Sequence, residues 1–318
     1  MHAQLHPLLD TLAAQGDAAT TGGWNITPLA GGANNKPYRA TGELGDIVVK
    51  FTRRDERDRA GREYAALRLL QERAPGLAPR PVLLDRERYA RPVVVQTWIP
   101  GDMVQEPPHS DAEWTAWLEC IARVHAIGLG GQDDLLPCWE NGNGSTGYAA
   151  TVEALRQATI ENDLPAETRQ LVERLAKLPL GGWPEAEPRL CRADHNTRNF
   201  MRDTDGLRLV DWEYSGWGDP LEDLAELMTH VTYMEVPHGR WQEVAAEYAR
   251  LRGTDGCAER LRICLAIKAV GWSVRLARFL AKKKGPEARG AWRTDTPKKH
   301  AYYLDRIRDD PMLEMLRA

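Results

Sequence analysis

One segment of the chain, residues 190–213 (LCRADHNTRNFMRDTDGLRLVDWE), constrains the fold more than any other part. Four turn-forming residues, Asp203-Thr204-Asp205-Gly206, separate two short runs that suit β-strands, Asn199–Met201 and Leu207–Val210. Strand-forming runs on both sides of such a turn favour a reversal of the chain. The segment therefore predicts a β-hairpin.

The open end of this hairpin gathers oxygen-bearing side chains. Folding the chain about Asp205 brings the amide of Asn199 level with the carboxylate of Asp211, and Asp194 lies five residues before Asn199. Amide and carboxylate oxygens are the ligands of a hard divalent cation such as Mg²⁺, which usually keeps phosphate and water in its shell. The segment predicts a metal site for phosphoryl transfer, and the alternative is a hairpin with solvated acids at its mouth.

A glycine-rich stretch near the N-terminus is a second candidate for phosphate contact. It follows a predicted strand at residues 24–29 and comprises Gly31, Gly32, Ala33, Asn34 and Asn35. Glycine lets backbone N–H groups approach phosphate oxygens without a Cβ in the way. The stretch is therefore a candidate for covering a nucleotide, although a plain hairpin turn has the same composition.

A lysine set into an apolar strand is the third feature. The run Ile47–Phe51 (IVVKF) is β-branched and apolar apart from Lys50, whose ammonium must be paired or reach solvent. The next predicted helix carries Glu63, and Glu56 lies between the two elements. Glu63 is a candidate partner for this ammonium. Glu56 competes for that role, and a solvated helix face is the alternative for Glu63.

Composition and length limit the class of protein. At 318 residues the chain exceeds the usual single-core limit, so two lobes are expected, over residues 1–98 and 99–318. No apolar run approaches the ~18 residues of a membrane span, which predicts a cytoplasmic protein without a membrane partner. The net charge of -4 argues against nucleic acid as a partner. The five cysteines lack C-x-x-C spacing and are expected in the core rather than in disulfides or a zinc site.

The helical half is predicted from caps and periodic apolar residues. Ser110 and Glu113 form a capping box before an apolar series, in which His125 is expected to be packed rather than functional. Asp219 before Pro220 predicts an N-cap, and Asp223 on the following helix is expected to be structural.

The motifs together resemble a known family. The pattern D-x-x-x-x-N followed by a hairpin and a second Asp is that of the protein-kinase-like fold. The wording ADHNTRNF and LVDWEYSGWGDPLEDLAEL resembles the aminoglycoside phosphotransferases and choline kinases, which phosphorylate hydroxyls of small molecules. The resemblance implies an α+β, two-lobe fold, with a small β-rich N-lobe that has one helix and a larger, mainly helical C-lobe.

The resemblance also implies roles for the motifs. Asp194 would orient the substrate hydroxyl and accept its proton, while Asn199 and Asp211 would hold Mg²⁺ on the phosphates of ATP. Lys50 and Glu63 match the ion pair that holds this lysine on the phosphates in such enzymes, so Lys50 is expected to contact phosphate with Glu63 as its partner. Residues 95–101 (VQTWIPG) resemble the family's inter-lobe hinge, so Gln96 and Trp98 are placed at the nucleotide base by position alone.

Three residues are candidates for the acceptor pocket: Glu213, Tyr214 and Trp272. An acid and aromatic rings beside a hydroxyl suit a cationic amine. Arg275 and Arg278, on the same predicted helix as Trp272, suit an anionic acceptor instead. Core packing is the alternative for Trp272.

The family usually has histidine two residues before the catalytic Asp, whereas this chain has Arg192. We expect Arg192 to brace the loop and activity to survive. The expected function is an ATP- and Mg²⁺-dependent phosphotransferase acting on an amino alcohol or an aminoglycoside. The alternatives are a sugar or amino-acid-derived hydroxyl kinase and a catalytically impaired nucleotide-binding protein. The sequence leaves the oligomeric state open.

Overall fold

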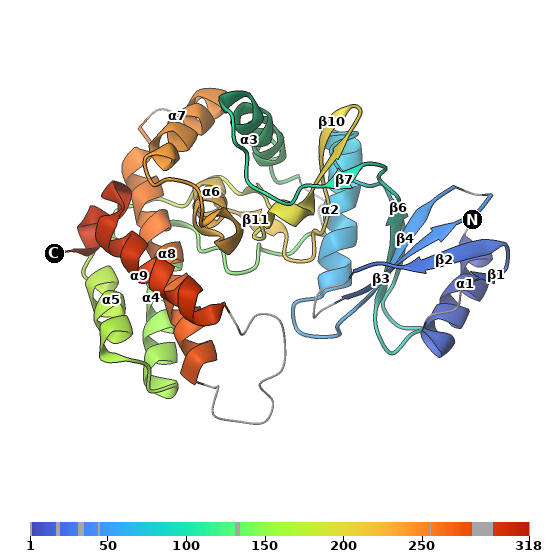
Figure 1. The fold of residues 1–318 in the computed structure, drawn as a ribbon, viewed down its shortest axis with the longest axis horizontal. Helices are drawn as coiled ribbons and strands as arrows, with labels where there is room; N and C mark the ends of the chain where they lie inside the picture. Colours follow the sequence, from blue (N-terminus) through green and yellow to red (C-terminus); the bar gives the residue numbers. More distant parts are fainter. Residues whose placement is uncertain are drawn as a thin grey trace. The chain divides into compact units, whose positions relative to one another are not determined.

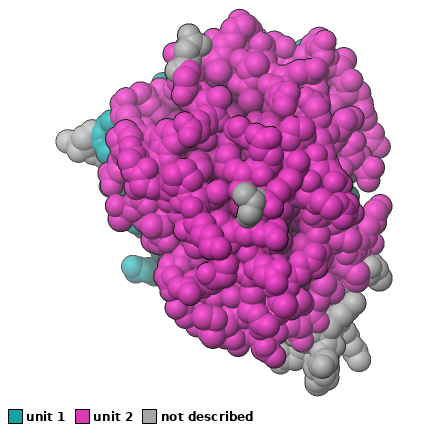
Figure 2. All heavy atoms as spheres, turned by 90° about the vertical axis from the view of Figure 1, so that its left-hand side faces the viewer, with its two compact units in different colours: residues 1–104, 129–139, 198–216 teal, residues 105–128, 140–197, 217–318 magenta. Residues whose placement is uncertain are grey.

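The computed structural model describes residues 2–16, 20–30, 35–43, 45–130, 134–254, 256–281 and 295–317. Gly31, Gly32 and Asn34, predicted to cover a nucleotide, lie outside the described residues. The chain forms two compact units, one of residues 1–104, 129–139 and 198–216, and the other of residues 105–128, 140–197 and 217–318 (Figure 2). The predicted lobe boundary after residue 98 stays a prediction.

The first unit is built on a six-stranded antiparallel sheet in the order β1-β2-β3-β4-β6-β5 (Figure 1). Its strands are β1 (Thr20–Thr21), β2 (Trp24–Pro28), β3 (Asn35–Thr41), β4 (Ile47–Thr52), β5 (Pro81–Asp85) and β6 (Val93–Thr97). The central strand β4 is buried along its whole length, which explains its apolar and β-branched sequence.

Two helices cover opposite faces of this sheet. Helix α1 (His2–Gln15) packs its leucines into a core that includes Ile47, Val49 and Phe51. Because side chains alternate along a strand, Lys50 points to the other face, where α2 (Arg59–Arg73) contacts β5 and β6. This alternation is what allows a lysine inside an apolar strand.

The predicted hairpin is present in the first unit, in a slightly different register. The short helix η1 (Thr197–Asn199) leads into β9 (Phe200–Asp203) and β10 (Gly206–Leu209), with β7 (Asp102–Met103) on the outer side of β9. The strands pair Phe200 with Leu209 and Asp203 with Gly206, so the turn has two residues. Asn199 is therefore opposite Val210, whose N–H donates to the Asn199 carbonyl at 2.9 Å, rather than opposite Asp211 as expected.

The second unit is mainly helical. It contains α3 (Asp111–His125), α4 (Gly144–Glu161), α5 (Ala166–Ala176), α6 (Pro220–Thr229), η2 (Val231–Tyr233), α7 (Arg240–Arg252), α8 (Ala258–Ala281), α9 (Thr296–Asp309) and η4 (Pro311–Leu316). Short strands β8 (Arg189–Cys191) and β11 (Gly216–Gly218) pair with each other. Helix α8 packs against α6 and α9, and every residue of α6 after Pro220 is buried.

Local sequence signals in this unit are confirmed. Ser110 and Glu113 form both hydrogen bonds of a capping box at the start of α3. The Asp219 side chain accepts a hydrogen bond from the backbone of Leu221, with Pro220 at the first position of α6. The α+β class predicted from the sequence is also confirmed. Within the described residues, no helix is long and apolar enough to cross a membrane.

Candidate functional site

The first unit places Lys50 between two carboxylates. Its ammonium Nζ lies 2.6 Å from Oε1 of Glu63 on α2 and 3.1 Å from Oδ1 of Asp211, after β10. The predicted pairing with Glu63, rather than with Glu56, is present. Burial alone lowers the pKa of Lys50, but the charges of Asp211 and Glu63 outweigh it and raise that pKa above its usual value. A fixed positive charge therefore stands beside Asp211.

Asn199 directly precedes strand β9 of the hairpin, and Asp211 lies two residues after the end of strand β10. The backbone bond between Val210 and Asn199 holds the two segments together at this end. Asp211 has a φ of 65°, in the left-handed region that few residues other than glycine, asparagine and aspartate adopt readily. Its side chain is 31% exposed, so the carboxylate can accept a ligand besides Lys50. The donor set of one amide and one carboxylate is of the type that Mg²⁺ uses.

Glu213, which the sequence predicts to contact the acceptor substrate, forms hydrogen bonds with two other side chains of the protein. Its Oε1 accepts from Nη1 of Arg59 at 2.9 Å, and its Oε2 accepts from the side-chain amide of Asn35 at 3.0 Å. The guanidinium of Arg59 also lies over the ring of Tyr214, 4.9 Å from its centroid. These contacts tie the start of α2 and the start of β3 to the segment after Asp211. The acceptor roles of Glu213 and Tyr214 stay predictions.

Glu213 predicts a pH dependence of stability. Burial and the negative charge of Asp211 raise the pKa of Glu213 to about 7, from an ordinary value near 4.5. The folded state then holds a proton that the unfolded state releases, so this stabilisation is full below pH 4.5 and is lost as the pH rises through 7. We expect the free energy of unfolding of the parent to fall, relative to that of Glu213→Gln, by up to about 3 kcal/mol over this range.

Urea denaturation at several pH values from 5 to 8 measures this difference. Glu72→Gln, at an exposed position on α2, is the control and should run parallel to the parent. A constant difference between the parent and Glu213→Gln across the range would contradict the prediction.

The second unit holds Asp194 in a loop after β8. The carboxylate is partly exposed, and its Oδ1 accepts from the backbone N–H of Asn196 at 3.1 Å. Nε2 of His230 lies 3.6 Å from the same oxygen. Burial, together with the negative charge of Asp194, raises the pKa of Glu226 well above its usual value. Glu226 therefore holds its proton more strongly than an ordinary glutamate does.

Asp223 on α6 anchors this loop. Its Oδ1 accepts from the backbone N–H groups of Arg192 at 3.1 Å and Ala193 at 2.7 Å, and its Oδ2 accepts from Nε2 of His195 at 2.9 Å. Burial alone raises the pKa of Asp223, but His195 and His125 hold it well below the usual range. Ala193 has a φ of 59°, a backbone conformation that costs ~1–2 kcal/mol. These bonds offset that strain, so Asp223 fixes the backbone just before Asp194.

Arg192 is buried, and its Nη2 donates to the backbone carbonyl of Asp194 at 3.4 Å. This contact is with the backbone and not with the carboxylate. It has the geometry of the brace that the sequence predicted, while survival of activity stays a prediction.

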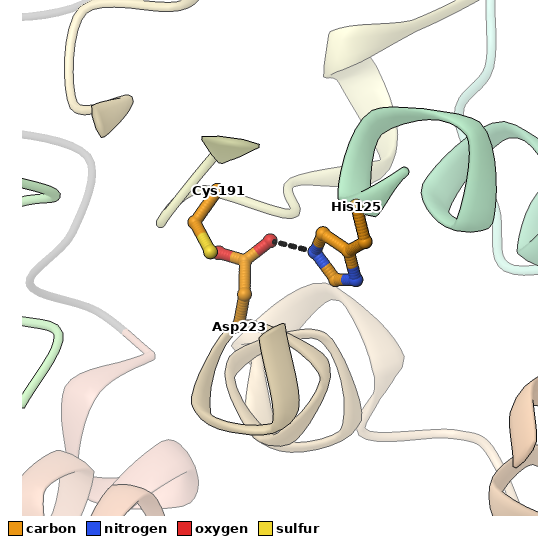
Figure 3. A group of neighbouring side chains, drawn as sticks. All are labelled: His125, Cys191 and Asp223. Carbon is orange, nitrogen blue, oxygen red and sulfur yellow. Dashed lines mark hydrogen bonds and ion pairs between the residues drawn. The ribbon is translucent and has the colours of Figure 1, made fainter. Parts of the chain in front are cut away.

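His125, Cys191 and Asp223 are the single group of potential metal ligands found together among the residues that the structure describes (Figure 3). Both ring nitrogens of His125 are engaged, Nε2 with Asp223 at 3.0 Å and Nδ1 with the hydroxyl of Tyr248 at 2.7 Å. Since Asp223 also accepts from the loop that carries Asp194, this group is a buried hydrogen-bonding network. The prediction of a packed His125 is confirmed. All five cysteines are free, and four of them are buried as expected, whereas Cys257 is partly exposed.

Trp272 on α8 is buried, with 7% of its surface exposed. Its ring stacks on Tyr303 at 5.8 Å, meets His230 edge-on at 5.6 Å, and has the guanidinium of Arg275 4.8 Å from its centroid. Little of the ring is left for a ligand. A direct contact between Trp272 and the acceptor stays a prediction.

The predicted hinge, residues 95–101, begins within β6 and continues beyond its end. The backbone N–H of Thr97 donates to Arg80, and that of Trp98 donates to Asp46. These two backbone N–H groups are therefore engaged within the first unit. Gln96 is buried in β6, and the nucleotide contacts of Gln96 and Trp98 stay predictions.

Sequence reasoning missed two contacts of the site. The partners of Glu213, which are Arg59 and Asn35, come from distant elements, and no local pattern announces them. His230 beside Asp194 has no sequence signal either. Asp223 had one, because an acid on a helix rich in apolar residues needs hydrogen-bond partners where that helix is buried.

Several proteins of known structure have a fold similar to that of this chain. A choline/ethanolamine kinase family protein from Mesorhizobium loti superposes with a TM-score of 0.64 at 20% identity, over 98% of this chain and 97% of that one. Spectinomycin phosphotransferase APH(9)-Ia, solved with ADP and spectinomycin, gives 0.62 at 14% identity, over 98% and 97%. A thermostable mutant of aminoglycoside phosphotransferase APH(4)-Ia, solved with AMP-PNP and hygromycin B, gives 0.59 at 13% identity, over 98% of each chain.

These likenesses establish the protein-kinase-like fold. No curated protein sequence matches the chain. The model of the phosphotransferase enzyme family matches residues 25–263, which is most of the chain. The chain therefore belongs to the phosphotransferase enzyme family and is a small-molecule kinase.

Proposed function

We propose that the chain transfers the γ-phosphate of ATP, with Mg²⁺, to a hydroxyl of an amino alcohol or an aminoglycoside-like amine. The observation that carries this proposal is the ammonium of Lys50 held between Glu63 and Asp211, in a chain of the phosphotransferase family. A lysine fixed in this way supplies a positive charge for nucleotide phosphates. The complexes of two structural neighbours with ADP and AMP-PNP support ATP as the donor.

The residues present fit a magnesium ion. Asn199 would supply an amide oxygen and Asp211 a carboxylate oxygen, and both belong to the first unit. When bound, Mg²⁺ would offset the negative charge of the phosphate oxygens. Orientation of the acceptor hydroxyl and removal of its proton are assigned to side chains of this protein.

In the proposed reaction, Asp194 orients the acceptor hydroxyl and accepts its proton. The hydroxyl oxygen forms a bond to the γ-phosphorus as the bond from that phosphorus to the ADP oxygen breaks. The transition state of such transfers is loose in most analyses, so positioning matters more than base strength. Asp223 and Arg192 supply that positioning through the backbone of the loop.

The acceptor class rests on the structural neighbours. Two neighbours were solved with the amine-bearing antibiotics spectinomycin and hygromycin B, and another belongs to the choline/ethanolamine kinase family. A second candidate, a sugar or amino-acid-derived hydroxyl, is favoured by one observation. Glu213 and Trp272, the predicted contacts of a cationic amine, already have the guanidinium groups of Arg59 and Arg275 as neighbours.

Release of ADP from Mg²⁺ and ATP tests the proposal. The panel contains choline, ethanolamine, several aminoglycosides and a set of sugars, with Asp194→Ala as the blank. Release above the blank with an amine supports the leading proposal, and release with sugars alone supports the second candidate. Equal rates for the parent and the blank with every acceptor would contradict both.

A further inference from the structure

His230, at the end of α6, faces the loop that carries Asp194. We propose that His230 is a positioning residue for Asp194, whose carboxylate it holds in place through the proton on its Nε2. The inference rests on the proposed function, because it gives Asp194 the role of proton acceptor. It concerns a contact inside the second unit only.

The hydrogen bonds of the ring determine where its proton lies. Nδ1 of His230 is 3.3 Å from the backbone nitrogen of Thr232, and a backbone N–H can only donate. Nδ1 therefore accepts and carries no proton in the neutral ring. The proton is left on Nε2, which lies 3.6 Å from Oδ1 of Asp194. This distance is a few tenths of an ångström beyond a hydrogen bond, and catalytic contacts tighten when substrate binds.

Thr232 links the contact between His230 and Asp194 to a series of hydrogen bonds, each with one donor and one acceptor. Its Oγ1 accepts from the backbone N–H of Thr197 at 3.3 Å and lies 2.9 Å from Nδ1 of His230, to which its hydroxyl proton can be donated. Each link then has one donor and one acceptor, from Thr197 through Thr232 and His230 to Asp194. This series begins and ends in the same loop, so it fixes the loop at two points.

The surroundings keep the imidazole neutral and oriented. Burial lowers the pKa of His230 to about 3, and electrostatic interactions with His195, Arg275 and Lys299 act in the same direction. A neutral donor orients a carboxylate without neutralising its charge. The ring also meets Trp272 edge-on, and Trp272 stacks on Tyr303. Trp272 and Tyr303 would then support the ring of His230, and this role needs no contact with the acceptor substrate.

Two substitutions separate the two sides of the ring. The amide nitrogen of Gln can replace the Nε2 donor, so His230→Gln keeps a proton toward Asp194. The amide oxygen of Asn can replace the Nδ1 acceptor, so His230→Asn keeps the bond to Thr232 and loses the donor. With water as the acceptor, we expect His230→Asn to lower kcat for ADP release from Mg²⁺ and ATP by about 10- to 100-fold. KM for ATP should stay unchanged, and His230→Gln should recover most of the rate.

Equal kcat values for the parent and His230→Asn, at equal thermal stability, would overturn the inference. So would equal losses in the two variants.

A measurement without turnover separates this inference from the proposed function. In protein labelled with ¹⁵N-histidine, long-range ¹H–¹⁵N spectra report which ring nitrogen carries the proton. We expect His230 to be protonated at Nε2 and not at Nδ1, with an Nε2 signal that moves in Asp194→Asn. Asp163→Asn, at an exposed position of the same unit, is the control and should leave the signal in place.

A proton on Nδ1, or an Nε2 signal whose position is unchanged in Asp194→Asn, would overturn the inference even if the protein is an active kinase. The expected spectra in a protein that shows no ADP release above its blank would instead sustain the contact and remove the proposed function.

Discussion

Replacement of Asp194 with alanine is expected to lower kcat by ~10²–10⁴-fold, the usual contribution of a positioned proton acceptor. The Kd for ATP should change little, because Lys50, Asn199 and Asp211 belong to the other unit and keep their side chains. Single-turnover transfer and nucleotide titration measure the two quantities separately. The acceptor is the one that gives the highest ADP release in the panel.

The asparagine variant sharpens this test. Asp194→Asn keeps an oxygen for the N–H of Asn196, so the turn after residue 194 can persist while the proton acceptor is removed. We expect it to be nearly as inactive as Asp194→Ala. Asp163→Asn, at an exposed position of the same unit whose left-handed backbone asparagine tolerates, should retain the parent rate. Turnover of either Asp194 variant at the parent rate would refute the assignment of Asp194.

Replacement of Asp211 with asparagine is expected to have the second largest effect. It should weaken Mg²⁺-dependent binding of ATP by ~10²–10³-fold, since two unit charges 4 Å apart interact by about 4 kcal/mol at an effective dielectric of 20. Asparagine tolerates the left-handed backbone found at this position, so the fold should survive. Alanine would add strain of ~1–2 kcal/mol and confuse the result.

Isothermal titration of ATP with and without Mg²⁺ makes the measurement. Asp205→Asn, in the exposed turn of the same hairpin, is the matched control and should bind like the parent. Binding that remains as dependent on Mg²⁺ in Asp211→Asn as in the parent would exclude Asp211 as a metal ligand. The proposed metal site would then be lost, whatever the outcome for Asp194.

Local elements followed from the sequence because short-range interactions decide them. The strand around Lys50, the capping box at Ser110 and the N-cap at Asp219 all appear where they were expected. The register of the hairpin did not follow. The Asp203 side chain accepts from the backbone N–H of Asp205, and Gly206 has a positive φ of 123°, which closes the turn in two residues. Residue types alone allowed several turn lengths.

The candidate site also has features that followed from the sequence and features that did not. The sequence by itself determined the chemical groups, because a lysine in an apolar strand and the D-x-x-x-x-N segment are visible without a fold. Only the tertiary structure decided their partners, including the contact of Glu213 with Arg59 and that of His230 with Asp194. Such pairs depend on which faces of distant elements pack together. That packing is set by the burial of whole helices and strands, and the residues that meet through it carry no periodic or local signal of their own.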